Sequence, residues 1–187
     1  IVGDMPFGSY QASVHDAVNN AVRLIKAGAE IVKLEGGVHV REAIEAIVRA
    51  DIPVMGHIGL TPQSYHRMGG NKVQGRTEGA QSGSRDRISE DARAVEEAGV
   101  CAFVIEAVPA ALALEITTAA GIPTIGIGAG VNCDGQVLVL HDLLGLSERS
   151  FTFAKAYSNL RLLSINAVAE YVSDVQHRRF PDASNSF

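Results

Sequence analysis

The sequence predicts an α/β protein in which a parallel β-sheet is covered on the outside by helices. Apolar runs typical of buried strands alternate with segments whose apolar residues recur at helical spacing. Several of these runs end in glycine, and the chain contains 19 glycines, as tight strand-to-helix turns require. Hydrophobic residues make up 47% of the 187 residues, which is enough to form a packed core and excludes intrinsic disorder.

In chain order, each strand-like run is bounded by turn residues or by a helix-like segment. Strands are expected at residues 1–4, 31–34, 53–57, 101–105, 123–127 and 136–140, and helices at residues 11–27, 40–49, 85–98, 109–119 and 151–177. Gly28 and Gly99 mark helix ends, and Pro109 fits the first turn of a helix. We expect a loose polar tail over residues 180–187.

Two closures of such a sheet are possible, an open doubly wound sheet and a (β/α)8 TIM barrel. The glycines of residues 126–130 follow a strand, but no convincing helix follows them, which argues against a dinucleotide-binding fold. A barrel needs eight strands, and the chain opens on what we interpret as a strand end. We therefore expect residues 1–187 to form a single, incomplete TIM-barrel domain missing about the first two βα units.

Composition excludes several classes of function. The net charge of −5 gives no basic surface for nucleic acid. No apolar run approaches the ~18 residues that a membrane span needs, and no charged-then-apolar leader opens the sequence. Cys101 and Cys133 are too few for a disulfide framework or a zinc cage, so we expect free thiols in the reducing cytoplasm.

Four of the expected strands end in ionisable residues, which are Asp4, Glu35, His57 and Glu106. In a parallel barrel the carboxyl ends of all strands open on the same mouth, so these side chains are expected to converge. A helix-capping role explains any one of the acids, but it explains all four strand ends less well. The mouth of the barrel is therefore the candidate site.

The residue types at these positions indicate a chemistry. Asp4 and Glu35 are hard oxygen ligands that suit Mg²⁺. Lys33 points to the same side of its strand as Glu35 and either forms a structural salt bridge or holds a substrate oxygen. Glu106 ends an apolar strand, which suits general acid–base work, although it also precedes a helix that it could cap. His57 is either a hydrogen-bonding or proton-relay group or a satisfied core histidine.

Other polar residues carry weaker signals. Residues 61–84 form a long polar loop, and Lys72 and Arg76 within it either face an anion or are simply solvated. For His141 and Asp142, after the last expected strand, we favour a structural role over a second site pair. The remaining histidines read as surface residues.

At the strand ends the sequence resembles the ketopantoate hydroxymethyltransferase family. The resemblance covers almost the whole chain in order, and its combined motifs are specific. The matching segments are residues 3–8 (GDMPFG), 32–37 (VKLEGG), 56–64 (GHIGLTPQS), 69–70 (GG), 73–76 (VQGR), 105–109 (IEAVP), 122–130 (IPTIGIGAG) and 134–142 (DGQVLVLHD).

The resemblance implies a barrel of the phosphoenolpyruvate mutase/isocitrate lyase type. It implies hydroxymethyl transfer from 5,10-methylenetetrahydrofolate to 3-methyl-2-oxobutanoate through a Mg²⁺-stabilised enolate, which gives 2-dehydropantoate for pantothenate and coenzyme A biosynthesis. It further implies that Asp4 and Glu35 ligate Mg²⁺, that Asp4 and Lys33 contact the keto acid, and that Glu106 accepts the proton. His57 is our additional candidate for substrate binding, from its place at a strand end. The resemblance also implies a cytoplasmic location and a homo-oligomeric assembly, which in this family is a decamer.

The sequence departs from the family in one serious respect. A further N-terminal stretch, with a Gly-Asp-Ser whose Asp is another metal ligand, has no counterpart here. Ala107 stands where the family usually has Cys or Met. Two alternatives therefore stay open: another Mg²⁺-dependent enzyme of the same superfamily acting on an α-keto acid, or an inactive barrel fragment serving as a binding or assembly module.

Overall fold

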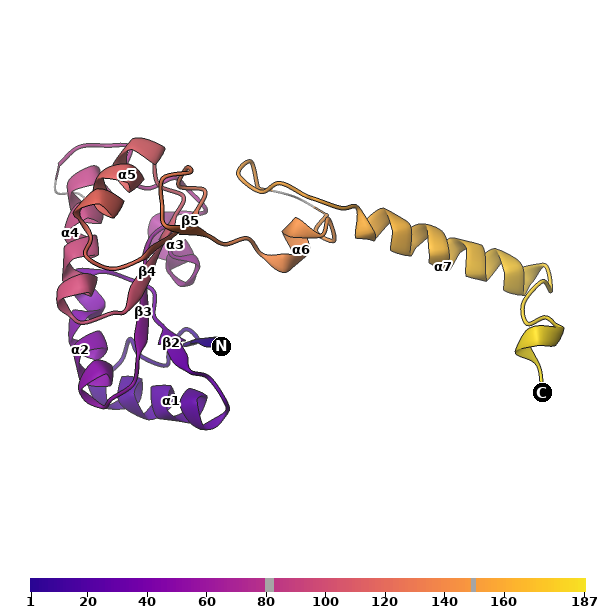
Figure 1. Ribbon diagram of the computed structural model, residues 1–187, viewed down its shortest axis with the longest axis horizontal. Helices are drawn as coiled ribbons and strands as arrows, with labels where there is room; N and C mark the ends of the chain where they lie inside the picture. Colours follow the sequence, from indigo (N-terminus) through magenta and orange to yellow (C-terminus); the bar gives the residue numbers. More distant parts are fainter. Residues whose placement is uncertain (80–82, 149–150) are drawn as a thin grey trace. The chain divides into compact units, whose positions relative to one another are not determined.

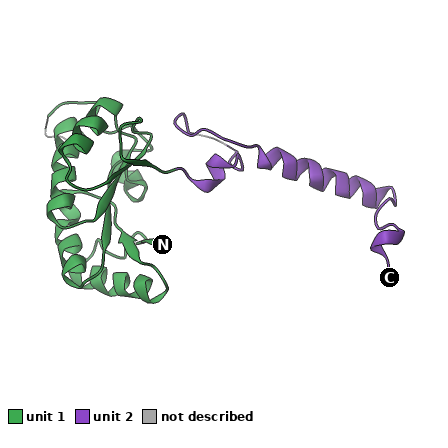
Figure 2. Cartoon of the chain, viewed as in Figure 1, with its two compact units in different colours: residues 1–137 green, residues 138–187 purple. Residues whose placement is uncertain are grey.

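The computed structural model describes residues 1–79, 83–148 and 151–187. The chain divides into two compact units, Ile1–Val137 and Leu138–Phe187, which are coloured separately in Figure 2. That residues 1–187 form one domain stays a prediction. Among the described residues, no helix is both long enough and apolar enough to cross a membrane.

The first unit holds six strands and the helices that join them. Its elements are β1 (Val2–Asp4), α1 (Val14–Lys26), β2 (Ile31–Lys33), η1 (Val38–Val40), α2 (Arg41–Arg49), β3 (Val54–Gly59), η2 (Pro62–Ser64), α3 (Tyr65–Met68), α4 (Arg85–Glu97), β4 (Ala102–Glu106), α5 (Ala110–Ala119), β5 (Thr124–Ile127) and β6 (Gly135–Gln136). The second unit holds α6 (Leu140–Leu143), α7 (Leu160–Gln176) and η3 (Ala183–Asn185).

The strands form one sheet in the order β1-β2-β3-β4-β5-β6, and every neighbouring pair is parallel. Helices α1, α2, α4 and α5 lie along one face of this sheet (Figure 1). A doubly wound sheet reverses its strand order at a switch point and carries helices on both faces. The unreversed order with helices on one face is that of a partial (β/α)8 barrel, which confirms the predicted fold class.

Local sequence explains where the two long helices of this unit begin. The Ser13 hydroxyl accepts a hydrogen bond from the Asp16 amide at 3.1 Å, which caps α1. The Ser84 hydroxyl caps α4 in the same way. The first helix therefore begins at Val14 rather than at residue 11, the start that apolar spacing alone predicts.

The core lies between the sheet and its helices. Side chains alternate along each strand, so Phe103 and Ile105 of β4 face the helices, while Val104 and Glu106 face the opposite side. Phe103 and Ile105 are fully buried, as are Val32 of β2 and Ile44 of α2. The face opposite the helices is therefore the one that carries the polar strand-end residues.

Two expected elements differ from the structure. The strand expected at residues 136–140 is only Gly135–Gln136, because the Val139 carbonyl accepts hydrogen bonds from the Asp142 and Leu143 amides and starts α6. The helix expected over residues 151–177 begins at Leu160, where the Asn159 side chain caps it at 3.2 Å. Apolar composition alone did not reveal these two caps. Residues 80–82 of the expected loop lie outside the described residues.

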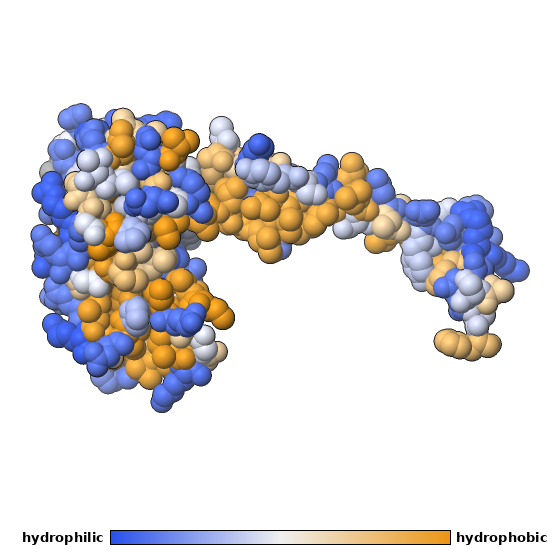
Figure 3. Space-filling view, viewed as in Figure 1, coloured by the Kyte–Doolittle hydropathy of each residue, from blue (hydrophilic) through white to orange (hydrophobic). Residues whose placement is uncertain are grey.

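Helix α7 shows apolar side chains around its circumference. Hydrophobic residues gather over α6 and the first part of α7 in Figure 3, and none of the residues of α7 is buried. Its exposed apolar side chains are Leu162, Leu163, Ile165, Val168, Tyr171, Val172 and Val175. Within the described part of this unit, α7 therefore has no core of its own to pack against.

The buried aromatic ring of β4 gives a test of the core. Phe103→Ala removes a fully buried ring between the sheet and its helices, and we expect it to lower the free energy of unfolding by about 3–5 kcal/mol. The matched control is Phe7→Ala, because Phe7 is 74% exposed, and it should change the stability by no more than about 0.5 kcal/mol. Urea unfolding followed by circular dichroism measures both. Equal losses would contradict this description of the core.

Candidate active site

The structure brings the strand-end residues Asp4, Lys33, Glu35, His57 and Glu106 into one cluster. Asp4 lies beside Lys33 in the β1–β2 register, and His57 lies beside Val104 in the β3–β4 register. Lys33 and Glu35 are two residues apart and point to the same face. The convergence that the sequence predicts is therefore present at the carboxyl ends of four neighbouring strands.

Lys33 is the centre of this cluster. Its Nζ lies 2.7 Å from Asp4 Oδ1, 4.0 Å from Glu35 Oε1 and 3.3 Å from His57 Nδ1. Its side chain is only 14% exposed, and a buried ammonium is costly unless anions and hydrogen-bond acceptors surround it. The structural salt bridge that was one of the two expectations for Lys33 is present, and it also aims the ammonium at the mouth.

His57 connects this ammonium with Glu106. An ammonium can only donate, so His57 Nδ1 accepts from Lys33, and this contact assigns the imidazole proton to Nε2. Nε2 lies 3.1 Å from Glu106 Oε2, yet it is buried and makes no hydrogen bond of acceptable geometry. Buried polar atoms are normally partnered, so a small shift of Glu106 or a ligand oxygen is expected to satisfy this N–H group.

The backbone around Glu106 is unusually constrained. Ala107 has φ +48°, a left-handed conformation that residues other than glycine rarely adopt. Two hydrogen bonds hold it there: Ala107 N donates to Ile127 O, and Gln74 N donates to Ala107 O, both at 2.9 Å. Strain that neighbouring contacts enforce is typical of functional sites. Sequence inspection did not reveal it, because alanine gives no sign of a left-handed turn.

Gly59 explains how Glu106 comes so close to β3. Gly59 has φ +87°, and a Cβ atom there would lie 2.3 Å from the Glu106 carbonyl oxygen. That same oxygen accepts a hydrogen bond from Leu60 N at 2.8 Å. Only glycine allows both the left-handed turn and this close approach.

Sequence reasoning missed two residues that touch Glu35. Gln63 N donates to Glu35 Oε2 at 2.9 Å, and Glu35 N donates to the Tyr10 hydroxyl at 3.1 Å. Burial raises the pKa of Tyr10 to about 12, with smaller upward contributions from the charges of Glu35 and Asp4 and a downward one from its hydrogen bond with the Glu35 backbone. Tyr10 therefore stays a neutral phenol. Gln63 lies inside the motif of residues 56–64, but the motif gives no indication of its contacts.

Asp4 and Glu35 fit a hard divalent cation. Among the described residues, no group of three or more His, Cys, Asp or Glu side chains is placed to hold a metal. These two carboxylates nevertheless lie within 4.0 Å of the same cationic nitrogen, so a positive charge already lies beside both. Mg²⁺ is commonly bound by one or two carboxylates together with water and substrate oxygens, which matches this donor set.

The other candidate residues lie outside the cluster. Lys72 and Arg76 are exposed. Asp142 belongs to the second unit, where its Oδ1 accepts a hydrogen bond from the Ser147 hydroxyl at 2.5 Å, and this contact supports the structural role. Cys101 and Cys133 are free thiols.

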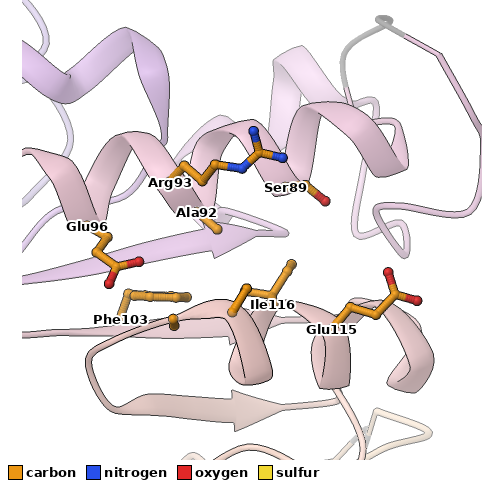
Figure 4. Close-up of a pocket in the computed structure, with 9 residues that line it drawn as sticks. Ser89, Ala92, Arg93, Glu96, Phe103, Glu115 and Ile116 are labelled. Atoms are coloured by element: carbon orange, nitrogen blue, oxygen red, sulfur yellow. The ribbon is translucent and has the colours of Figure 1, made fainter.

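A hollow elsewhere in the unit does not belong to the site. A cavity of about 210 Å³ lies between α4 and α5, and Figure 4 shows Arg93 from α4, Ile116 from α5 and Phe103 around it. Phe103 faces the helices rather than the cluster, so this cavity is on the opposite face of the sheet from the strand-end residues.

Comparison with known families shows which family the chain belongs to. A family model described as ketopantoate hydroxymethyltransferase matches residues 1–183. The chain belongs to the ketopantoate hydroxymethyltransferase family. The recognition made from the strand-end motifs is thereby confirmed.

Similar proteins are known from several organisms. The chain is 57% identical to the 3-methyl-2-oxobutanoate hydroxymethyltransferase of Geobacter metallireducens, and the match covers all of this chain and 69% of that protein. It is 50% identical to the enzyme of the same name from Pyrobaculum arsenaticum, over 97% of this chain and 67% of that protein. The chain thus spans about two thirds of the length of these relatives.

A solved structure has a fold similar to that of this chain. A phosphonomutase-type protein from Burkholderia cenocepacia superposes with a TM-score of 0.50 at 16% identity, over 92% of this chain and 70% of that one. At this identity the similarity concerns the fold alone. It agrees with the parallel α/β fold of the first unit.

The close packing of Gly59 against the Glu106 carbonyl oxygen gives a test of the site geometry. Gly59→Ala combines a left-handed alanine with a collision against the Glu106 backbone. Gly8→Ala is the matched control, since Gly8 has φ +88° and an added methyl group there would meet nothing within 4 Å. We expect Gly59→Ala to lower the free energy of unfolding by about 1–3 kcal/mol more than Gly8→Ala does. Chemical denaturation measures the difference, and equal losses would show that Gly59 does not set the position of Glu106.

Proposed function

We propose that the protein transfers a hydroxymethyl group from 5,10-methylenetetrahydrofolate to 3-methyl-2-oxobutanoate, which gives 2-dehydropantoate. The observation that carries the proposal is the cluster of Asp4, Lys33, Glu35, His57 and Glu106 in a chain of this family. The cluster offers what the reaction needs, which is two carboxylates for a metal, one cationic side chain for substrate oxygens and one carboxylate for a proton.

We propose that Asp4 and Glu35 hold Mg²⁺. Asp4 is 65% exposed at the side chain and Glu35 only 8%, so Asp4 faces the open mouth while Glu35 lies deeper. When bound, the ion would polarise the keto and carboxylate oxygens of the substrate and stabilise the negative charge that develops there. An α-keto acid presents these two oxygens side by side, which suits chelation.

Lys33 and Asp4 would orient the keto acid. The Lys33 ammonium has three donor positions, and its contacts with Asp4 and His57 account for two of them. The third is available for a substrate oxygen. The positive charge of the ammonium would stabilise the negative charge that this oxygen gains when the keto acid becomes an enolate. The two expectations for Lys33, salt bridge and substrate contact, are therefore compatible.

Glu106 would accept the proton from C3 of the keto acid. Its side chain is 15% exposed, so solvent competes little for the carboxylate while the mouth still admits a substrate. The proton on His57 Nε2 faces Glu106 Oε2, and a donated hydrogen bond would orient the carboxylate toward the mouth. The carbon that loses its proton would then attack the methylene carbon carried by the folate. The bonds between that methylene carbon and the folate nitrogens would break, water would supply the hydroxyl oxygen of the product, and tetrahydrofolate would leave.

We also propose the wider properties that the family resemblance implies. These are a single barrel domain, a homo-oligomeric assembly and a cytoplasmic location, and the free thiols of Cys101 and Cys133 support the last of them. Neither alternative function is favoured by a specific feature, since the family model matches residues 1–183 and the cluster retains the side chains that the reaction would use.

Replacing the proposed base tests the proton transfer directly. Glu106→Gln keeps the shape of the side chain and removes the base, so exchange of the C3 proton of 3-methyl-2-oxobutanoate with D₂O should slow by ~10²–10⁴-fold. Glu115→Gln is the control, because Glu115 is an exposed glutamate on α5, and it should leave the exchange unchanged. Proton NMR follows the reaction. Exchange at the wild-type rate in Glu106→Gln would make His57 the next candidate for the base.

Replacing the proposed ligands tests the metal site. Asp4→Asn and Glu35→Gln each remove one anionic oxygen ligand, and we expect each to weaken Mg²⁺ binding by at least ~10-fold. Asp16→Asn is a suitable control, since Asp16 lies exposed in the first turn of α1. Isothermal titration calorimetry provides the affinities. Wild-type affinity in both variants would rule these carboxylates out as the ligands.

A further inference from the structure

Gln63 lies where three strand-to-helix connections meet, and it contacts both segments that carry the proposed metal ligands. Its backbone N–H group donates to Glu35 Oε2 at 2.9 Å. Its side-chain Nε2 donates to the carbonyl oxygen of Met5 at 2.8 Å, and Met5 directly follows Asp4. One residue from the β3–α4 connection thus ties the end of β1 to the carboxylate that follows β2.

Tyr10 completes this arrangement from the β1–α1 connection. Its hydroxyl lies 2.7 Å from Gln63 Oε1 and 3.2 Å from Glu35 O, and it accepts from Glu35 N at 3.1 Å. A phenol has a single proton, and the nearer acceptor is Gln63 Oε1. The hydroxyl therefore donates to Gln63 while it accepts from Glu35. Tyr10 is 3% exposed, so water does not replace either contact.

These contacts give the two oxygens of Glu35 different surroundings. Oε2 accepts from the Gln63 backbone, whereas Oε1 lies 4.0 Å from Lys33 Nζ and 3.9 Å from His57 Nδ1. Only Oε1 therefore faces the cluster. Any rotation of the Glu35 carboxylate that turned Oε2 toward the cluster would break its hydrogen bond with Gln63.

The end of β1 depends on the same residue. The Asp4 side chain is 65% exposed and is held by its ion pair with Lys33 at 2.7 Å, while separate contacts hold the backbone that follows it. Met5 is fully buried, its N–H group donates to Lys33 O at 3.0 Å, and its carbonyl accepts from Gln63. The Gln63 side chain thus supplies one of the two backbone contacts that hold the segment next to Asp4.

We propose that Gln63 and Tyr10 are positioning residues that fix the Asp4 and Glu35 carboxylates relative to each other and thereby set the affinity of the site for a divalent cation. The inference rests on the metal assignment made under the proposed function. Mg²⁺ tolerates little departure from its preferred geometry. Groups that orient metal ligands typically change metal affinity by 10–100-fold when they are removed.

The test measures metal affinity without substrate in the full protein, with Mn²⁺ as the probe and electron paramagnetic resonance as the readout. Gln63→Ala removes the contacts with Met5 and Tyr10 but keeps the backbone N–H group that binds Glu35. We expect Mn²⁺ affinity to fall by ~10–100-fold. Tyr10→Phe keeps the buried ring and loses only the hydroxyl, and a fall in the same direction is expected.

Gln11→Ala is the matched control. Gln11 Nε2 also donates to Gln63 Oε1 at 3.1 Å, and Gln11 Oε1 accepts from the Tyr10 backbone at 3.4 Å. Gln11 is nevertheless exposed, and within the described residues it is hydrogen-bonded to neither Glu35 nor Met5. Its Mn²⁺ affinity should stay within about twofold of wild type, well short of the change expected for a group that orients a metal ligand.

Thermal unfolding without metal separates positioning from a merely structural role. If Gln63→Ala does not fold, Tyr10→Phe decides, because it leaves the core packing intact. Folded variants that bind Mn²⁺ as tightly as wild type would overturn the inference, even if their melting temperatures fall, and would leave the proposed function untouched. A wild-type protein that does not bind Mn²⁺ would instead contradict the metal assignment itself, and the inference with it.

Discussion

The largely buried ammonium of Lys33 is the constraint around which the site is organised. It lies on the face of the sheet opposite the helices, where solvent reaches little of it, and it needs acceptors on every side. Asp4 supplies one at 2.7 Å, and His57 supplies another at 3.3 Å. Because Lys33 can only donate, the proton of His57 is placed on the nitrogen that faces Glu106. One charged side chain therefore links a proposed metal ligand with the proposed base.

The parallel sheet makes this arrangement possible with residues far apart in sequence. Each βα unit returns the chain to the same end of the sheet, so one polar residue per strand suffices to build a cluster. The connections then refine its geometry. Gly59 lets the backbone of Glu106 approach β3 closely, Ala107 turns the chain directly after Glu106, and Gln63 ties two strand ends together. The sheet thus supplies the location of the site, and the connections supply its precision.

Much of this was predictable from the sequence, and the rest was not, for identifiable reasons. Strand ends such as Glu35 and Glu106 follow from apolar runs and glycines, because burial on both faces of a parallel strand leaves a clear pattern. Tyr10 and Gln63 escaped prediction because their contacts join separate connections, and no sequence spacing records such contacts. The expected strand at residues 136–140 was wrong beyond Gln136, since a short helix that starts at Leu140 follows an equally apolar run.

We propose that Asp4, Lys33, Glu35 and Glu106 form one site for a metal-bound keto acid. A crystal structure of the protein with Mg²⁺ and 3-methyl-2-oxobutanoate would test this proposal. We expect the ion on carboxylate oxygens of Asp4 and Glu35, an oxygen of the keto acid on the Lys33 ammonium, and Glu106 facing C3 of the ligand. A keto acid bound elsewhere, or an ion that contacts neither Asp4 nor Glu35, would contradict it.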